Sequence, residues 1–315
     1  MTFISYAQNY EDVTLYRALK YVDNGFYIDV GAQDPIIDSV TKAFYERGWR
    51  GINIEPVDYW FNKLLADRPE DHNLKVAAAA EAGTLKFYEV VGTGMSTSDA
   101  SFAAKHAAAG FEVRGKEVPA RCLNEICDEL GVTEIHFLKI DVEGAEGEVL
   151  AGIDLTRIRP WVVLLESTEP NSAVPTHEKW EELLTTRGYV FVYFDGLNRY
   201  YVSREQKIQL KAAMSTPPNY FDHFIRYSEW WAGQRAQRME TEVTDAHNRL
   251  QVLQNELDQL RNAMAQMESR LGARESELAG VYRTVSWRMT ASLRVANLLV
   301  KRFRRMIGPA VFKLL

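Results

Sequence analysis

The stretch from Gly25 to Pro56 constrains what this chain can fold into more than any other part of it. It contains an apolar run that ends at Val30, a turn around Gly31, a helical segment, and a second apolar run that ends at Glu55. This order is typical of two parallel strands joined by a helix, a unit in which ligands bind beyond the carboxyl ends of the strands. A glycine at the turn accepts a positive φ and lets a ligand approach the backbone closely. We therefore expect an α/β sheet with a ligand site at this turn.

Two adenosine-containing cofactors suit such a unit, a nicotinamide dinucleotide and S-adenosylmethionine. With either cofactor, Glu55 would accept hydrogen bonds from the ribose diol. A dinucleotide needs a glycine-rich turn that places its pyrophosphate at a helix N-terminus, but this turn has only Gly31. Asp29 and Asp34 flank the turn and would repel a diphosphate, whereas they would attract a sulfonium and an ammonium group. The turn favours S-adenosylmethionine, and a structural turn that binds nothing is the remaining alternative.

Acidic residues also follow two other apolar runs. The run that ends at Ile140 is followed by Asp141, Glu143 and Glu146, and the run that ends at Leu165 is followed by Glu166. Three carboxylates at the edge of one pocket repel each other unless a cation or a shared proton relieves them. The cluster therefore indicates a cationic ligand. Glu146 has an alternative role as a first-turn helix residue that the helix dipole favours.

The order of the apolar runs predicts a doubly wound, seven-stranded α/β sheet. Five runs read as parallel strands and two as a following antiparallel pair. They cover residues 26–30, 52–54, 73–79, 135–140, 160–165, 189–194 and 200–202. Two further strand-like runs, 85–91 and 116–122, lie around a segment rich in glycine, serine and alanine that is either flexible or shaped by a ligand.

Four segments, taken in order, resemble one known family. They are SYAQNYEDV, FYIDVGAQDPIIDSVTKAFYERGWRGINIEP, FLKIDVEGAE and FVYFDGLNRYYV. Over about residues 3–210 the chain resembles the FkbM-type S-adenosylmethionine-dependent methyltransferases, in the branch associated with bacterial surface polysaccharides. The resemblance implies a Rossmann-like methyltransferase sheet and an enzyme that methylates a sugar hydroxyl in surface glycan biosynthesis. A catalytically inactive adaptor of the same fold, which scaffolds a glycan-assembly complex, is the alternative.

The resemblance also implies roles for single residues. Asp29, Gly31 and Ala32 would line the methionine side of the cofactor, Glu55 would hold the ribose hydroxyls, and Asp141 would face the sulfonium and the acceptor. Gln33 departs from the family pattern, because such proteins commonly have Asn at this position. Three polar residues near the N-terminus either contribute to the site or cap the helix that follows them: Tyr6, Gln8 and Glu11.

Methyl transfer to a hydroxyl requires an acceptor for the hydroxyl proton, and a positioned general base would add roughly 10²–10⁴-fold to the rate. His177 is our candidate, because it lies just beyond the carboxyl end of a central strand. Asp141 and Glu166 compete with it, and they could instead hold a Mg²⁺ ion that lowers the acceptor's pKa. Positioning of the acceptor without a base is a third mechanism. Three residues of the hairpin turn either contact the sugar or are ordinary turn residues: Asp195, Asn198 and Arg199.

Beyond residue 240 the apolar pattern changes to a heptad repeat. Its seam alternates spacings of three and four residues without a slip: Val243, Ala246, Leu250, Leu253, Leu257, Leu260, Met264, Met267 and Leu271. This pattern predicts a coiled coil and therefore a homo-oligomer, as either a dimer or a trimer. We expect a methyltransferase domain at residues 1–214, a linker and helix at 215–235, a coiled coil at 236–280, and a basic amphipathic tail at 281–315.

The tail differs in charge from the rest of the chain. The net charge is −6, yet no acidic residue follows Glu277 while eight basic residues do. A basic helix with one apolar face is typical of a segment that lies in an anionic membrane surface, and an acidic partner is the alternative. Nucleic acid is not expected beside so acidic a body. No secretory signal or spanning segment is visible, and Cys122 and Cys127 show no metal or disulfide spacing. We expect a cytoplasmic protein that is peripheral at the inner face of the membrane.

Overall fold

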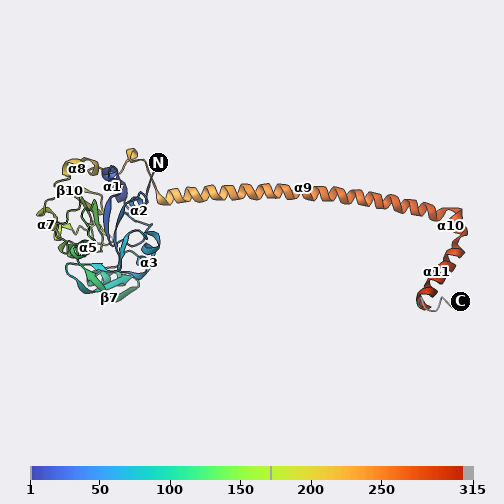
Figure 1. Ribbon diagram of the computed structural model, residues 1–315, viewed down its shortest axis with the longest axis horizontal. Coiled ribbons are helices and arrows are strands. Elements are labelled where there is room, and N and C mark those ends of the chain that lie inside the picture. Colours follow the sequence, from blue (N-terminus) through green and yellow to red (C-terminus); the bar gives the residue numbers. More distant parts are fainter. Residues whose placement is uncertain (1, 171, 308–315) are drawn as a thin grey trace. The chain divides into compact units, whose positions relative to one another are not determined.

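The computed structural model describes residues 2–170 and 172–307 (Figure 1). The chain divides into two compact units, one that ends at Gly233 and one that begins at Gln234. The first unit contains the β-sheets, and the described part of the second unit is helical.

A mixed sheet of seven strands forms the centre of the first unit. In spatial order the strands are β10 (Tyr189–Phe194), β11 (Asn198–Ser203), β9 (Val162–Glu166), β8 (Phe137–Ile140), β2 (Phe26–Val30), β3 (Arg50–Ile54) and β4 (His72–Leu74). The five strands from β9 to β4 are parallel, and β11 is antiparallel to both β9 and β10. This architecture confirms the predicted seven-stranded α/β sheet.

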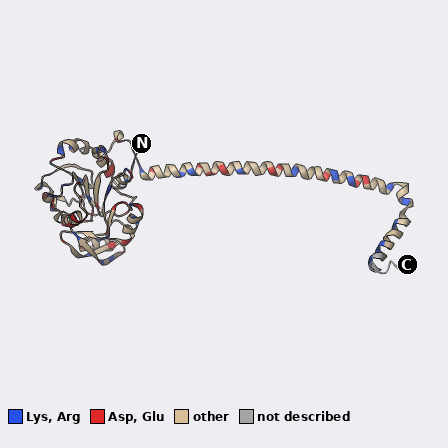
Figure 2. Cartoon of the chain, viewed as in Figure 1, with Lys and Arg blue, Asp and Glu red and all other residues tan. Residues whose placement is uncertain are grey.

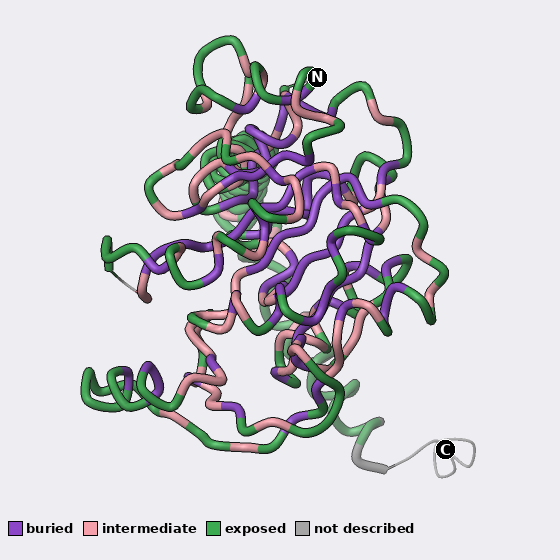
Figure 3. Tube along the Cα trace, turned by 90° about the vertical axis from the view of Figure 1, so that its left-hand side faces the viewer, coloured by how far each residue is buried: buried purple, intermediate pink, exposed green. Residues whose placement is uncertain are grey.

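The central strands are apolar throughout because both faces of the sheet are covered. In β2, Ile28 and Val30 belong to one hydrophobic core, whereas Tyr27 belongs to the other. In β8, Leu138 and Phe137 divide between the two cores in the same way. Figure 3 shows the buried segments concentrated in the interior of the first unit, and the residues of these strands are among the buried ones.

Helices supply the other half of each core. On the face of Tyr27, the core includes residues of α1 (Glu11–Leu19), α2 (Lys42–Tyr45) and α8 (Lys207–Met214). On the opposite face, it includes residues of α5 (Leu123–Glu129), α6 (Glu146–Ala151) and α7 (Glu181–Thr185). The helix predicted between β2 and β3 is only the four-residue α2, and most of that connection is irregular.

A second, smaller sheet corrects one predicted strand. The run 73–79 does not form a single strand, because β4 ends at Leu74 in the large sheet and β5 (Ala77–Ala78) pairs with β7 (Val113–Arg121) in the small one. The chain thus leaves one sheet and enters the other within three residues. The third strand of the small sheet is β6 (Gly83–Val90), which pairs antiparallel with β7, and α4 (Ala100–Ala108) lies between them in sequence.

The N-terminus is tied to the segment that leads out of the first unit. The strand β1 (Phe3–Ser5) pairs in parallel with β12 (Phe224–Arg226), which follows the short 3-10 helix η2 (Tyr220–Asp222). Arg17 of α1 joins the same region, because its guanidinium pairs with Asp222 at 3.0 Å. The remaining helix of this unit, α3 (Asp58–Asp67), follows β3.

The helices of the second unit expose their apolar residues. They are α9 (Tyr227–Arg283), which begins in the first unit, α10 (Val285–Met289) and α11 (Ala291–Ile307). The predicted seam residues lie on α9, and among them Leu253, Leu260 and Met267 are 60%, 63% and 69% exposed. In Figure 2, α9 has both acidic and basic residues, whereas all the charged residues of α11 are basic. None of the helices in the described ranges has an apolar stretch long enough to cross a membrane.

Candidate active site

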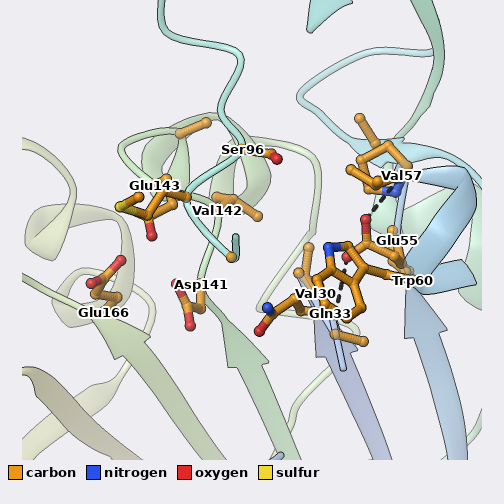
Figure 4. Close-up of a pocket in the computed structure, with 18 of the residues that line it drawn as sticks. Val30, Gln33, Glu55, Val57, Trp60, Ser96, Asp141, Val142, Glu143 and Glu166 are labelled. Carbon is orange, nitrogen blue, oxygen red and sulfur yellow. Dashed lines mark hydrogen bonds between the residues drawn. The ribbon is translucent and has the colours of Figure 1, made fainter. Parts of the chain in front are cut away.

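A cavity of about 360 Å³ lies where the parallel strands end (Figure 4). Its walls include residues that end the strands β2, β3, β8 and β9 or follow them within three residues: Gly31, Gln33, Glu55, Asp141, Glu143 and Glu166. Segments that converge at this edge of a doubly wound sheet form the usual ligand crevice of such folds. In Figure 4, the carboxyl groups of Asp141, Glu143 and Glu166 lie toward one end of the pocket and Glu55 toward the other.

The turn after β2 requires a glycine for two reasons. Gly31 has φ of +77°, and a Cβ placed on it would lie 1.8 Å from the backbone oxygen of Asp141. The Gly31 amide also donates to the carbonyl of Ile54 at 3.0 Å. The turn is therefore packed against the ends of both neighbouring strands.

The turn also fixes Glu55. The amides of Gln33 and Val57 donate to the two oxygens of this carboxyl group at 3.0 and 2.7 Å. Gln33 adopts φ of +49°, and Glu55 is only 4% exposed. Burial raises the pKa of Glu55 to about 7, and the two amide donors oppose this rise. Each oxygen keeps a second acceptor site, so the group can still accept hydrogen bonds from a diol.

An apolar wall stands beside Glu55. Val57 and Phe87 belong to a hydrophobic cluster of their own, and Trp60 packs against it. The indole of Trp60 donates to the carbonyl of Thr93 at 3.3 Å, which holds the segment 93–96 over the cavity. A flat aromatic base fits between such surfaces, with its sugar at the carboxylate.

Lys139 organises the charges below the turn. It stands next to Asp29 across the β2–β8 pair, and its ammonium lies 3.2 Å from Asp29 and 3.4 Å from Asp141. It also donates to the carbonyl of Gly31 at 2.9 Å. Its pKa is raised because the two carboxylates outweigh the effect of burial. Asp29 receives a further hydrogen bond from Thr41 at 2.9 Å and does not line the cavity, so it holds the turn from below.

The other end of the cavity is acidic. Asp141, Glu143 and Glu166 each bring one carboxylate oxygen within 4.8 Å of the others. Burial raises the pKa of Glu143 and of Glu166, and the charge of Asp141 raises both further. Glu146 is not part of this cluster. It is the first residue of α6, and its carboxyl group accepts a hydrogen bond from the amide of Gly144 at 3.0 Å.

Of the three N-terminal candidates, one reaches the cavity. Gln8 lines it, whereas the hydroxyl of Tyr6 donates to Glu46 at 3.0 Å and its ring stacks on Tyr227. Ala32 also lines the cavity. Glu11 is buried beneath the hairpin turn, where it accepts from Asn198 at 2.8 Å.

The predicted base and the predicted sugar contacts lie elsewhere. His177 begins the 3-10 helix η1 (His177–Lys179), is half-buried, and is not part of the cavity lining. Asp195 accepts from the Tyr200 hydroxyl at 2.9 Å, and Arg199 pairs with Glu181 at 3.0 Å. None of the three hairpin residues lines the cavity, although Leu197 between them does.

The sequence interpretation gave no site role to Lys139 or to Trp60. Lys139 was counted as part of an apolar strand, although a lysine within such a run is itself the signal of a buried ion pair. Glu143 was included among the acids but not singled out. Trp60 and the segment 93–96 come from separate parts of the chain, so no local pattern places them at the cavity.

The arrangement suits a cationic adenosyl cofactor. Glu55 and the apolar wall beside it match a nucleoside, and the acidic end matches a sulfonium or ammonium group. The close approach of Gly31 to Asp141 leaves no room for a side chain at the turn. The turn has no glycine-rich loop for a pyrophosphate, as a dinucleotide would need.

Comparison with known proteins identifies the family. Residues 29–191, more than half of the chain, match the family model described as "Methyltransferase FkbM domain". No curated protein sequence matches. Similar solved structures include a precorrin-6y C5,15-methyltransferase from Geobacter metallireducens, with 15% identity and a TM-score of 0.33 over 58% of this chain and 72% of that one. A TehB-like SAM-dependent methyltransferase from Corynebacterium glutamicum has 7% identity and a TM-score of 0.35 over 61% and 87%.

The family match begins within β2 and ends within β10, and it includes Gly31, Glu55, Asp141 and Glu166. The chain therefore belongs to the FkbM-domain family of methyltransferases, whose methyl donor is S-adenosylmethionine.

Proposed function

We propose that this protein methylates a hydroxyl group of a sugar during the biosynthesis of a bacterial surface glycan. The observation that carries the proposal is the cavity with Glu55 at one end and three carboxyl groups at the other. S-adenosylmethionine supplies the methyl group. The resemblance of four ordered segments to the polysaccharide branch of the family supports the choice of a sugar.

The residues of the turn after β2 would hold the cofactor. Gly31, Ala32 and Gln33 present backbone at the cavity, and Glu55 offers free acceptor sites for the ribose. Lys139 neutralises Asp29 and part of the charge of Asp141, which keeps the turn in place when no cation is bound. In this role Asp29 supports the methionine side of the cofactor from beneath.

The acceptor would bind at the acidic end. The cavity lining also includes Gln8, Thr168 and Ser172, which offer further partners for hydroxyl groups. Asp141 and Glu166 line the cavity and His177 does not, so these two carboxyl groups would act on the hydroxyl, either as its proton acceptor or as ligands of a cation that lowers its pKa. A hydroxyl held between them would be oriented toward the cofactor, which is the larger part of catalysis in such a transfer.

A catalytically inactive adaptor of the same fold is the second candidate. It would keep the sheet but would bind no cofactor, so calorimetric titration with S-adenosylmethionine separates the two functions. The test of the glycan proposal is mass spectrometry of the surface glycan from cells with the wild-type protein or Asp141→Asn. We expect a methylated sugar that disappears in the variant, and an unchanged methylation pattern would refute the proposal.

We further propose that the chain self-associates through α9. Leu257 is 47% exposed, and every other large apolar seam residue is more exposed than that. Each such side chain gains roughly 1.5–3 kcal/mol when it is fully buried. A second copy of the same helix supplies a matching seam, because heptad seams pack knobs into holes.

The basic helix α11 is proposed to lie in an anionic membrane surface. Leu293, Leu299 and Phe303 belong to its apolar side and are all more than 60% exposed. Arg294 and Lys301 lie on the other side of the helical wheel, and no acidic residue accompanies them. An apolar face buried among lipids with a cationic face toward the headgroups satisfies both sides. The enzyme would then act at the inner face of the membrane.

A further inference from the structure

We propose that Asp141, Glu143 and Glu166 bind a hard divalent cation of the Mg²⁺, Mn²⁺ or Ca²⁺ class at the acceptor end of the cavity. The proposal deepens the methyltransferase function and rests on it, because the ion would contact the acceptor. The three residues come from the end of β9 and from the segment that follows β8, so the sheet itself brings them together.

The spacing of the oxygens suits such an ion. One oxygen of each residue lies within 4.8 Å of the other two. Two oxygens bonded to one Ca²⁺ can be up to about 5 Å apart, and two bonded to one Mg²⁺ up to about 4 Å. Three oxygens spread evenly around one Ca²⁺ are at most about 4.3 Å apart, and around one Mg²⁺ at most about 3.6 Å apart, so either ion requires the carboxyl groups to draw in by at most about 1 Å.

Glu166 supplies an independent reason to expect a ligand. This residue is only 9% exposed, yet its Oε2 has no hydrogen-bond partner among the residues that the structure describes. The same holds for Oε2 of Glu143. A buried polar atom without a partner destabilises the folded state, and it does so more when it is charged. Both residues line the same cavity, and a single cation bound between them would relieve both carboxyl groups.

No protein cation takes that place. Within residues 2–170 and 172–307, the ammonium of Lys139 reaches Asp141 but is not within ion-pair distance of Glu143 or Glu166. Because Lys139 also pairs with Asp29, it balances only part of the negative charge. A proton shared by two of the carboxyl groups would relieve the repulsion between those two. The third carboxyl group would still have no partner in the cavity.

The backbone at Glu143 is held in an unusual conformation. Its φ is +54°, a left-handed conformation that is unfavourable for a residue other than glycine. The hydroxyl of Thr97 donates to the Glu143 carbonyl at 2.8 Å and fixes this conformation. The consequence is that the Glu143 side chain lies at the pocket beside Asp141 (Figure 4). A hydroxyl of the acceptor could then complete the coordination of the ion, which would lower the pKa of that hydroxyl.

The experiment measures binding of Mn²⁺ to the full chain after treatment with a chelator, by calorimetry and by the electron paramagnetic resonance of free Mn²⁺. We expect one saturable site that Mg²⁺ and Ca²⁺ displace. Glu143→Gln and Glu166→Gln should each weaken Mn²⁺ at least tenfold, because each removes one of three charged ligands. Glu148→Gln is the matched control, since Glu148 is an exposed residue of the neighbouring α6.

A titration with S-adenosylmethionine on the same samples separates this proposal from the methyltransferase function. If the wild type binds S-adenosylmethionine but no Mn²⁺, or if Glu143→Gln and Glu166→Gln bind Mn²⁺ as tightly as Glu148→Gln, the cation site is refuted and the proposed function stands. If S-adenosylmethionine fails to bind while Mn²⁺ binding depends on Glu143 and Glu166, the cation site stands and the proposed function falls. Should Glu143→Gln fail to fold, Glu166→Gln decides, because its backbone lies in a regular strand.

Discussion

Substitution of Gly31 by alanine tests whether the turn after β2 touches the end of β8 as described. The new Cβ would lie 1.8 Å from the carbonyl oxygen of Asp141, well inside any normal contact distance. The left-handed φ of +77° adds about 1–2 kcal/mol for a residue with a side chain. Relief of the contact requires the two strand ends to separate, and overpacking of this kind costs about 1–3 kcal/mol. We expect a total destabilisation of about 2–5 kcal/mol.

Two other glycines provide matched controls. Gly131 also has a positive φ, of +65°, but a Cβ there would meet nothing within 4 Å, so Gly131→Ala measures the backbone cost alone. Gly83 has neither a left-handed φ nor a close neighbour, and Gly83→Ala should be nearly neutral. Unfolding in urea, followed by near-ultraviolet circular dichroism, gives the three free energies. At roughly 2–4 °C per kcal/mol, the Gly31 variant should also lose more than about 4 °C of melting temperature.

Two results for Gly31→Ala would contradict this description of the turn. If Gly31→Ala costs no more than Gly131→Ala, the turn does not press against Asp141, and the derived geometry of the cofactor end is wrong. If Gly31→Ala is destabilised but binds S-adenosylmethionine with unchanged affinity, the turn is structural and does not form the cofactor site.

Three further predictions concern other parts of the chain. Burial, with the charge of Asp195, raises the pKa of Glu11 from 4.5 to about 8, so the folded state keeps a proton that the unfolded state has released. Glu11 should therefore contribute at most about 5 kcal/mol to the fall in the free energy of unfolding between pH 4.5 and 8. Glu11→Gln should flatten this fall in urea unfolding at several pH values, and an equal slope would refute the assignment. The double variant Leu253→Glu and Leu260→Glu places charges at the seam of α9 and should convert an oligomer to a monomer, as measured by light scattering. Asn255→Glu, which is not at the seam, should leave the oligomer intact, and a monomeric wild type would contradict the coiled coil. Deletion of residues 281–315 should abolish sedimentation with anionic liposomes and leave cofactor affinity unchanged, and undiminished sedimentation would count against the membrane role.

The sheet could be predicted from sequence because its strands are short apolar runs bounded by turn residues. The carboxyl ends of those runs also marked Gly31, Glu55, Asp141 and Glu166 as neighbours, since parallel strands end at the same edge of a sheet. All four line the cavity. What these residues do there stays a prediction until a ligand is measured.

Contacts between distant segments could not be predicted in the same way. The boundary between β4 and β5 depends on which sheet has a free edge, and the local sequence does not contain that information. Hydrogen bonds such as those of Asp195 and Arg199 engage turn residues that otherwise looked free to bind a sugar. The ion pairs of Lys139 could not be predicted for a related reason. Its partner Asp29 lies on the neighbouring strand β2, and its partner Asp141 lies just beyond the end of β8.

Titration of the purified full chain with S-adenosylmethionine, in a calorimeter and at a fixed temperature, tests the central claim most directly. We predict one saturable site per chain that S-adenosylhomocysteine occupies in competition, with affinity reduced at least tenfold in Glu55→Ala, which keeps a normal circular dichroism spectrum. A folded protein that gives neither heat nor a thermal shift with millimolar S-adenosylmethionine would contradict the account.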